Sequence, residues 1–142
     1  MLSEKNRLEK KLELLLHEKL LLLRNELLEK WKLQQNKNVL TAIINLDNPD
    51  LLKQLSFELR KMTSKTIIAL GANVDGKPMI SVMFSEDLQP TESLNAVQIV
   101  KSVSQYIQGG GGGQPFYATA GGKNLNGLEL ALNHIYNSFQ NF

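Results

Sequence analysis

The sequence contains no cysteine, which excludes disulfide bridges, thiol nucleophiles and cysteine-ligated zinc together. Long hydrophobic runs are also missing. The longest run of leucines is 20–23, and charged residues lie on both sides of it. A membrane-spanning helix needs about 20 consecutive, mostly apolar residues. We therefore expect no membrane segment and, because no secretory signal follows Met1, a cytoplasmic protein.

Residues that could support catalysis are scarce. The two histidines, His17 and His134, have no second histidine or carboxylate cluster at the spacing of metal ligands. The acidic pair Glu86-Asp87 follows an expected strand, where a turn role is more common than acid–base catalysis. No serine lies in a nucleophile elbow. The sequence predicts a chain without an active site, a metal site or a cofactor of its own.

Charge is divided unevenly along the chain. Residues 1–37 contain nine Lys/Arg and six Asp/Glu, whereas residues 38–142 contain seven and eight. The basic residues of the first part alternate with glutamates, a pattern typical of a solvated helix face. Any attraction to phosphate is therefore modest, and it comes more from the first part than from the second.

Residues 3 to about 35 contain no glycine or proline and consist mainly of the strong helix formers leucine, glutamate and lysine. They predict one helix roughly 50 Å long. Leucines follow two stripes on it, one with spacings of three and four and one with a strict heptad. The first stripe is Leu8, Leu12, Leu16, Leu20, Leu23, Leu27 and Trp31, and the second is Leu14, Leu21 and Leu28. Two stripes imply a wide buried face, so we expect oligomerisation, as a homodimer or with a helix from a longer parent chain.

From residue 38 onward, strand-type and helix-type segments alternate. The pattern predicts, in order, a strand at 38–46, a helix at 47–63, strands at 66–70 and 79–84 joined by the turn Asp75-Gly76-Lys77, a helix at 91–108, a glycine-rich loop at 109–122, and a helix beginning at Asn124 or Asn126. The predicted class is α+β. A long coiled-coil-like helix, residues 1–37, precedes a small mixed-sheet domain, residues 38–142, in the order β-α-β-β-α-loop-α.

The glycine-rich loop is the strongest local feature. Positions without a Cβ atom let a phosphate or ribose approach closely, and adjacent amides can form an anion nest. A lysine follows the second glycine pair, just before an expected helix N-terminus, which favours a phosphate. Two aromatic rings between the glycine clusters suit stacking on a base. The candidate nucleic-acid-binding residues are Gly109, Gly110, Gly111, Gly112, Gly113, Gln114, Phe116, Tyr117, Gly121, Gly122 and Lys123.

Simpler interpretations of this segment remain open. The five consecutive glycines are also compatible with a flexible connector, and Phe116 or Tyr117 is equally compatible with the core. Neither nucleotide-binding fingerprint fits: Gly121-Gly122-Lys123 is followed by asparagine, so there is no P-loop, and the glycines follow a helix where a dinucleotide fold needs a strand.

The segment 107–123, followed by a leucine- and alanine-rich helix, resembles the end of bacterial alanyl-tRNA synthetases. That family closes with a G-G-x-G-G-G-x-P-x-x-A-x-A-G-G pattern. The matching residues are Gly109, Gly110, Gly112, Gly113, Pro115, Ala118, Ala120, Gly121 and Gly122. The upstream order of long helix, strand, helix and hairpin matches as well, so the resemblance extends over essentially the whole chain.

The resemblance implies a DHH-associated domain, shared with a phosphoesterase family. In the synthetases this domain contacts the elbow of the alanine tRNA and helps aminoacylation and editing act on one tRNA. It also implies that the helical segment is similar to one that mediates self-association. ATP and zinc are expected only in other domains of the parent synthetase. The phosphoesterase relatives usually carry a histidine beside the glycines, where this chain has Gln114.

Three hypotheses follow for function. The first is an accessory module of an alanine–tRNA ligase that binds the tRNA elbow, with tRNA and the remaining synthetase domains as partners. The second is a purely structural dimerisation element without RNA binding of its own. The third, an enzyme of the phosphoesterase type, has the least support because the D-H-H motif is absent from this chain.

Overall fold

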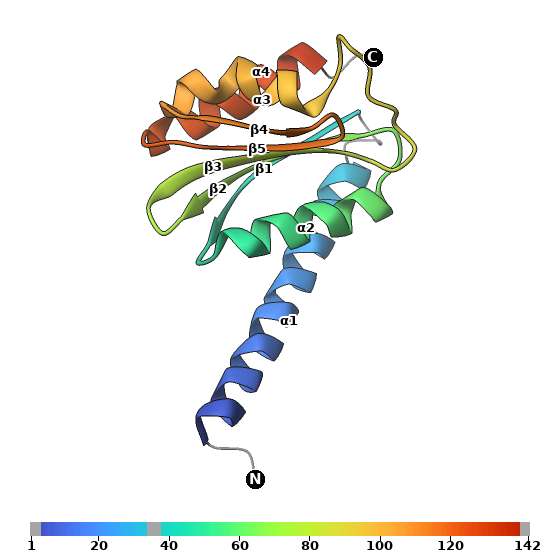
Figure 1. Ribbon diagram of the computed structural model, residues 1–142. Coiled ribbons are helices and arrows are strands. Elements are labelled where there is room, and N and C mark those ends of the chain that lie inside the picture. The colour runs from blue at the N-terminus through green and yellow to red at the C-terminus, as the bar shows by residue number, and fades with distance from the viewer. Residues whose placement is uncertain (1–3, 34–37, 140–142) are drawn as a thin grey trace.

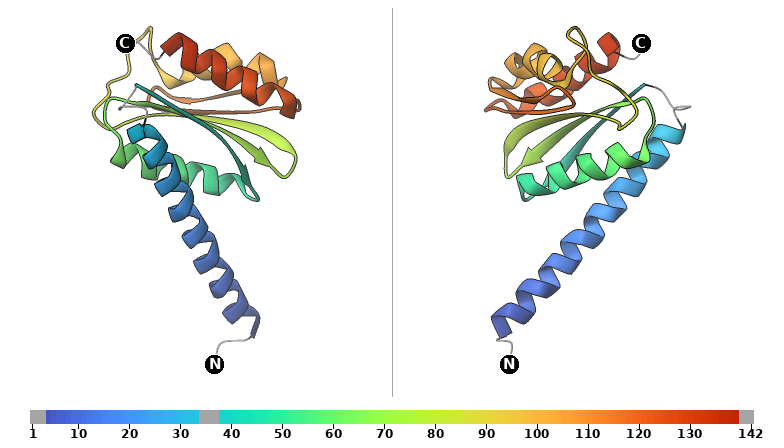
Figure 2. Two further views of the ribbon diagram at one scale, coloured as in Figure 1. Left: turned by 180° about the vertical axis from the view of Figure 1, so that it is seen from behind. Right: turned by 45° about the vertical axis from the view of Figure 1, so that its right-hand side comes forward.

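The computed structural model describes residues 4–33 and 38–139 and has three layers around one sheet. Two helices cover one face of the sheet and one covers the other, while the N-terminal helix extends away from the body (Figures 1 and 2). The elements are α1 (Glu4–Leu33), β1 (Val39–Leu46), α2 (Pro49–Met62), β2 (Ile67–Val74), β3 (Lys77–Phe84), α3 (Ala96–Val103), β4 (Gly110–Gln114), β5 (Tyr117–Gly121) and α4 (Leu128–Phe139), with 3₁₀ turns at Ser104–Ile107 and Leu125–Gly127.

The sheet is mixed, in the order β1-β2-β3-β5-β4. β1 and β2 are parallel, because α2 crosses between them, and all other neighbours are antiparallel. The β2–β3 turn is made by Asp75 and Gly76, both with positive φ (53° and 85°), as expected of a tight hairpin. β1 and β4 are therefore the two edges of the sheet.

Local capping explains where the central helices begin. The Asn48 side chain accepts a hydrogen bond from the amide of Asp50 (2.8 Å), and Pro49 occupies the first turn of α2. Asn95 caps α3 in the same way, accepting from the amide of Gln98. The sequence predicted this helix from residue 91, but the Thr91 hydroxyl accepts from the amide of Leu94 and holds residues 91–95 in a non-helical turn.

Two hydrophobic clusters lie on the two faces of the sheet. The cluster under α3 and α4 includes Ile80, Val82, Val100 and Ile135, and the cluster under α2 includes Leu40, Leu55, Leu59 and Met83. β2 and β3 contribute to both clusters, with alternate residues on each side. The sheet is thus a double-sided core whose two edges remain at the surface.

The C-terminal half of α1 is part of the second cluster. Leu20, Leu27, Leu28 and Trp31 are buried against α2 and β1, and Arg24 pairs with Glu58 of α2 (3.4 Å). The predicted boundary near residue 37 falls in 34–37, outside the described residues, and the core is continuous across it. No helix in the described part of the chain is long and apolar enough to cross a membrane.

The predicted α+β class, with a long N-terminal helix before a mixed sheet, is confirmed. One element is different: the glycine-rich loop predicted at 109–122 is largely an antiparallel pair of strands, β4 and β5. Glycine runs lack the alternation of apolar and polar side chains that marks a strand, so the sequence pattern gave no sign of this pairing.

Candidate nucleic-acid interface

The glycine segment forms a hairpin at one edge of the sheet. Gly110 pairs with Gly121 and Gly112 with Thr119, while Pro115 and Phe116 form the turn. β5 is joined to β3, and β4 is the terminal strand, so its outer edge is unpaired within the described residues. An edge strand presents backbone N–H and C=O groups to a partner, and this one carries almost no side chains to cover them.

Four glycines in and beside the hairpin are required by the fold itself. A Cβ atom on Gly111 would lie 1.9 Å from the carbonyl oxygen of Thr119, and one on Gly109 would lie 1.9 Å from that of Gly121. Gly113 has φ +156° and would place a Cβ 2.5 Å from the Tyr117 oxygen. The Gly122 Cβ would lie 2.1 Å from the Ile107 oxygen. Any side chain at these positions would break the hairpin.

The other glycines of the hairpin are not explained by internal packing. A Cβ atom on Gly110, Gly112 or Gly121 would meet nothing within 4 Å. All three are exposed, and Gly110 lies directly opposite Gly121. Together, Gly110, Gly112 and Gly121 form a surface without side chains, which we call the bare patch. It allows close approach of an external group, as the sequence analysis expected of these glycines.

The aromatic rings of Phe116, in the turn, and of Tyr117, at the start of β5, both make contacts within the chain. Phe116 packs against both core clusters and lies under the guanidinium of Arg60, 4.6 Å from ring centroid to Cζ. Tyr117 makes an edge contact with Phe57 of α2 (5.4 Å between centroids), and burial raises the pKa of its hydroxyl. Base stacking by Phe116 and Tyr117 therefore stays a prediction, while Gln114 is exposed at the end of β4.

The expected phosphate site before the last helix stays a prediction, and the structure shows that Lys123 does not directly precede α4. Lys123 is separated from α4, which begins at Leu128, by the 3₁₀ turn Leu125–Gly127. The backbone amides of Lys123 and Asn124 both donate to the carbonyl of Ile107 (2.8 and 2.9 Å). These amides are unavailable to an anion because they hold the end of the hairpin against the 3₁₀ turn before β4. What Lys123 offers a ligand is its exposed side chain.

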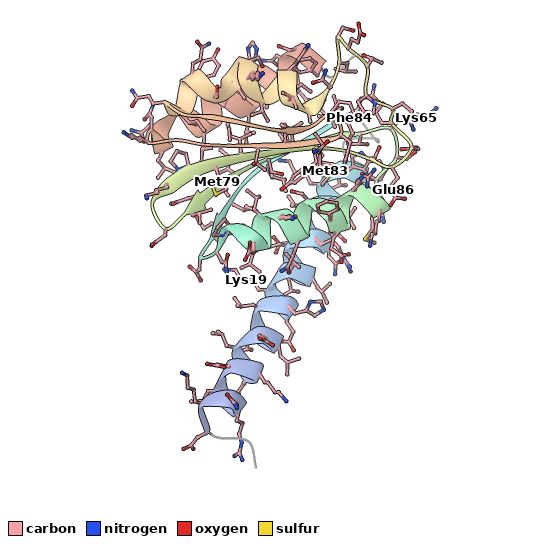
Figure 3. All side chains as sticks on the ribbon, viewed as in Figure 1. Lys19, Lys65, Met79, Met83, Phe84 and Glu86 are labelled. Carbon is pink, nitrogen blue, oxygen red and sulfur yellow. The ribbon has the colours of Figure 1, made fainter. Side chains whose placement is uncertain are left out.

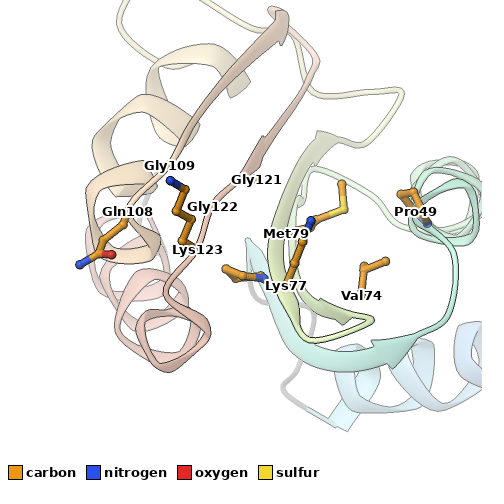
Figure 4. Close-up of a pocket in the computed structure, with 10 residues that line it drawn as sticks. Pro49, Val74, Lys77, Met79, Gln108, Gly109, Gly121, Gly122 and Lys123 are labelled. Carbon is orange, nitrogen blue, oxygen red and sulfur yellow. The ribbon is translucent and has the colours of Figure 1, made fainter.

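An open cleft of about 630 Å³ lies beside the bare patch (Figure 4). Lys77 and Met79 of β3 form one side and Lys123 the other, with Gly121 between them. Figure 3 places Met79 near the β2–β3 turn, while Met83 and Phe84 lie toward the opposite end of β3. The full lining is Pro49, Val74, Lys77, Pro78, Met79, Gln108, Gly109, Gly121, Gly122 and Lys123.

Six of these lining residues were not among the sequence candidates: Pro49, Val74, Lys77, Pro78, Met79 and Gln108. The sequence predicted the turn at Lys77. It did not predict that β3 lies next to the glycine segment, which follows from the pairing of Met79 with Gly121. Residues that meet through strand register give no local signal when one of the strands is not recognised. The cleft is thus a product of the sheet order.

The acidic pair after β3 has the turn role that the sequence favoured. Asp87 accepts hydrogen bonds from the Ser64 hydroxyl (2.6 Å), the Lys65 amide (2.8 Å) and the Ser85 hydroxyl (2.8 Å). The backbone amide of Lys65 contributes most to lowering the pKa of this carboxyl to about 2.

In residues 4–33 and 38–139, no three histidine or acidic side chains gather as metal ligands. His134 instead contacts the ring of Tyr106.

The leucine stripes of α1 divide between two environments. In the predicted stripes, Leu20, Leu27, Leu28 and Trp31 are buried, Leu16, Leu21 and Leu23 are half-buried, and Leu8, Leu12 and Leu14 are exposed. The first turns of α1 lie apart from the sheet and the other helices in Figure 3. Only the exposed leucines are available to a second copy or another domain, so oligomerisation stays a prediction for this half of the helix.

Comparison with known proteins places this chain in a family. It is 42% identical over 132 residues to the alanine–tRNA ligase of Christiangramia forsetii and 47% identical over 95 residues to that of Cytophaga hutchinsonii. The alignments cover 92% and 67% of this chain but only 15% and 11% of the two ligases. The chain therefore corresponds to a small part of each enzyme.

The fold is similar to the C-Ala domain of alanyl-tRNA synthetase from Aquifex aeolicus, with a TM-score of 0.62 and 22% identity over 70% of this chain and 87% of that domain. The resemblance to alanyl-tRNA synthetases found in the sequence is thereby confirmed. A family model for the DHHA1 domain matches residues 36–141, from just before β1 to beyond α4. The chain belongs to the DHHA1 domain family.

Proposed function

We propose that this chain is a non-catalytic module of an alanine–tRNA ligase and that it holds tRNA for the catalytic domains. Its similarity to the ligases of Christiangramia forsetii and Cytophaga hutchinsonii supports the parent enzyme. In this proposal the chain acts in the cytoplasm. ATP and zinc bind in other domains of the parent, and contact with the tRNA elbow couples aminoacylation to editing.

The bare patch is the observation that carries the proposal. Glycine loses more conformational entropy on folding than other residues, so three exposed glycines on one face of the β4–β5 hairpin need a reason. Gly109, Gly111 and Gly113 are explained by the β5 backbone, whereas the bare patch has open space where side chains would be. A sugar–phosphate backbone that approaches within contact distance of the strand supplies that reason, because any Cβ atom would hold it away.

A fluorescence anisotropy titration tests this function directly. The protein is titrated into labelled alanine tRNA and into the same tRNA with an altered elbow. We expect binding to the first, weaker binding to the second, and an affinity at least about tenfold lower for Gly112→Val, since a branched side chain would fill the approach path. Gln98→Val, on the exposed side of α3, serves as the control.

Two outcomes would contradict the proposal. The first is an absence of binding to alanine tRNA at micromolar protein. The second is an equal loss of affinity in Gly112→Val and Gln98→Val, which would show that the bare patch has no specific part in binding.

A second function, dimerisation, is favoured by the exposed half of α1. Leu8, Leu12 and Leu15 are 62%, 56% and 55% exposed, and they follow spacings of four and three on one side of the helix. Such a seam suits a second helix. Sedimentation equilibrium should show self-association that Leu12→Glu abolishes and that Leu33→Glu, at the other end of α1, preserves. A monomer at all concentrations would exclude this function, which is otherwise compatible with tRNA binding.

A further inference from the structure

The cleft beside the bare patch is lined by apolar residues, glycines and two lysines from different strands and loops. Its floor and walls are apolar or free of side chains, provided by Met79, Val74, Pro49 and Gly121. Its charged lining residues are two lysines, Lys77 and Lys123, on opposite sides, and the described lining includes no carboxylate. A ligand that fits must therefore combine an apolar surface with negative charge.

We propose that this cleft binds a single nucleotide unit of the tRNA. One base face lies on Met79 and Gly121, and Lys77 and Lys123 contact the phosphates on either side of it. The inference rests on the proposed tRNA-holding function and deepens it. It adds Lys77 and Met79 from β3 to the interface and identifies one nucleotide as the ligand of the cleft.

Strand register brings these groups together. Met79 pairs with Gly121 across β3 and β5, and Lys77 pairs with Val74 at the end of the β2–β3 hairpin. Lys123 lies two residues beyond the end of β5. The Gly122 amide donates to the carbonyl of Pro78 in β3 (3.2 Å), and the Lys123 amide donates to the carbonyl of Ile107 (2.8 Å). Both lysines are exposed while Met79 is half-buried, so the charges lie at the rim and the thioether lies deeper.

The chemistry of the floor selects a base over a simple anion. A methionine thioether makes favourable contacts with aromatic rings, and a position without a Cβ allows a flat ring to approach the backbone. A free phosphate would gain nothing from Val74, Pro49 or Met79, whereas an uncharged apolar ligand would gain nothing from the two lysines. The volume, about 630 Å³, is within the range of small-molecule sites.

The methionine methyl groups provide a direct readout. In protein labelled with ¹³C at the methionine methyls, titration with the alanine tRNA transcript should shift the Met79 signal upfield, because a stacked base shields it. Met83 is fully buried and Met62 lies at the far end of α2, so their signals should stay in place. Equal shifts of Met62 and Met79, or no shift of Met79 in a tRNA complex, would overturn the proposal.

The lysines are tested by the salt dependence of binding. Each phosphate contact contributes about 0.9 to the slope of log K against log salt. Lys77→Ala and Lys123→Ala should each reduce the slope by about that amount, and the double variant by about twice as much. Lys101→Ala, an exposed lysine of α3, is the matched control and should leave the slope unchanged.

The outcomes separate this inference from the proposed function. Retained tRNA binding with an unchanged slope in Lys77→Ala overturns the nucleotide cleft and leaves the tRNA-holding function intact. Failure of the unmodified protein to bind tRNA overturns both.

Discussion

At the scale of single residues, neighbouring glycines of β4 differ in whether the fold leaves room for a side chain. A methyl group on Gly111 would overlap the carbonyl oxygen of Thr119, whereas one on Gly112 would enter open space. We expect Gly111→Ala to lower the free energy of unfolding by about 2 kcal/mol or more and Gly112→Ala to change it by less than about 0.5 kcal/mol. Urea denaturation of the two variants measures the difference, and equal values would refute the assigned register of β4 and β5.

Asp87 makes a second residue-scale prediction, on acid stability. Its pKa is lowered from 3.8 to about 2 in the folded chain, so folding is favoured above pH 3.8 and this contribution is lost as the pH falls toward 2. Asp87→Asn removes the charged acceptor. Its deficit in unfolding free energy should therefore be largest above about pH 4 and should shrink toward pH 2. Urea titrations across this range test it, with Glu86→Gln as the neighbouring control.

At the scale of elements, α1 is two segments in one continuous helix. Leu27 is buried against α2, whereas Leu12 is 56% exposed. Leu27→Ala should lower the unfolding free energy by about 2–5 kcal/mol, because it removes core contacts and leaves a cavity. Leu12→Ala should change the stability of the monomer by less than about 0.5 kcal/mol. Thermal or urea unfolding at low protein concentration distinguishes the two, and similar losses would place the first half of α1 in the core.

The β4–β5 hairpin is an element held mainly by its neighbours. Its strands contribute Ala118 and Ala120 to the core, while β4 itself is exposed throughout. Backbone bonds anchor its two ends, with the Phe84 amide donating to Phe116 at the turn and the Lys123 amide donating to Ile107 at the base. Ordering a strand of glycines costs more conformational entropy than ordering other residues, and the anchored ends help to keep this strand in place.

At the scale of the whole molecule, the charge is too low for binding by bulk electrostatics. The formal net charge is +2, and the second part of the chain is slightly acidic. With two lysines as phosphate contacts, affinity for tRNA should fall only about tenfold between 50 and 200 mM salt. Anisotropy titrations at the two salt concentrations measure this. A loss of a thousandfold or more would instead indicate six or more phosphate contacts and a much wider interface.

The sequence by itself determined the elements with strong local signals. Strong helix formers specified α1, and Asn48 and Pro49 specified the start of α2. Asp75 and Gly76 specified the β2–β3 turn, and short continuous apolar runs specified the inner strands. The glycine motif also indicated the family and the region of the candidate site. Each of these signals depends on residues close together in the chain, where propensity, capping and turn geometry act.

Only the tertiary structure decided that the glycine run is an edge strand, which of its glycines the fold requires, and that Lys77 and Met79 face Lys123 across a cleft. It also decided which leucines of α1 are used internally. These features depend on pairing between distant segments. A strand without side chains has no periodicity to reveal its partner, and a helix that is leucine-rich on several faces does not specify which face will be covered.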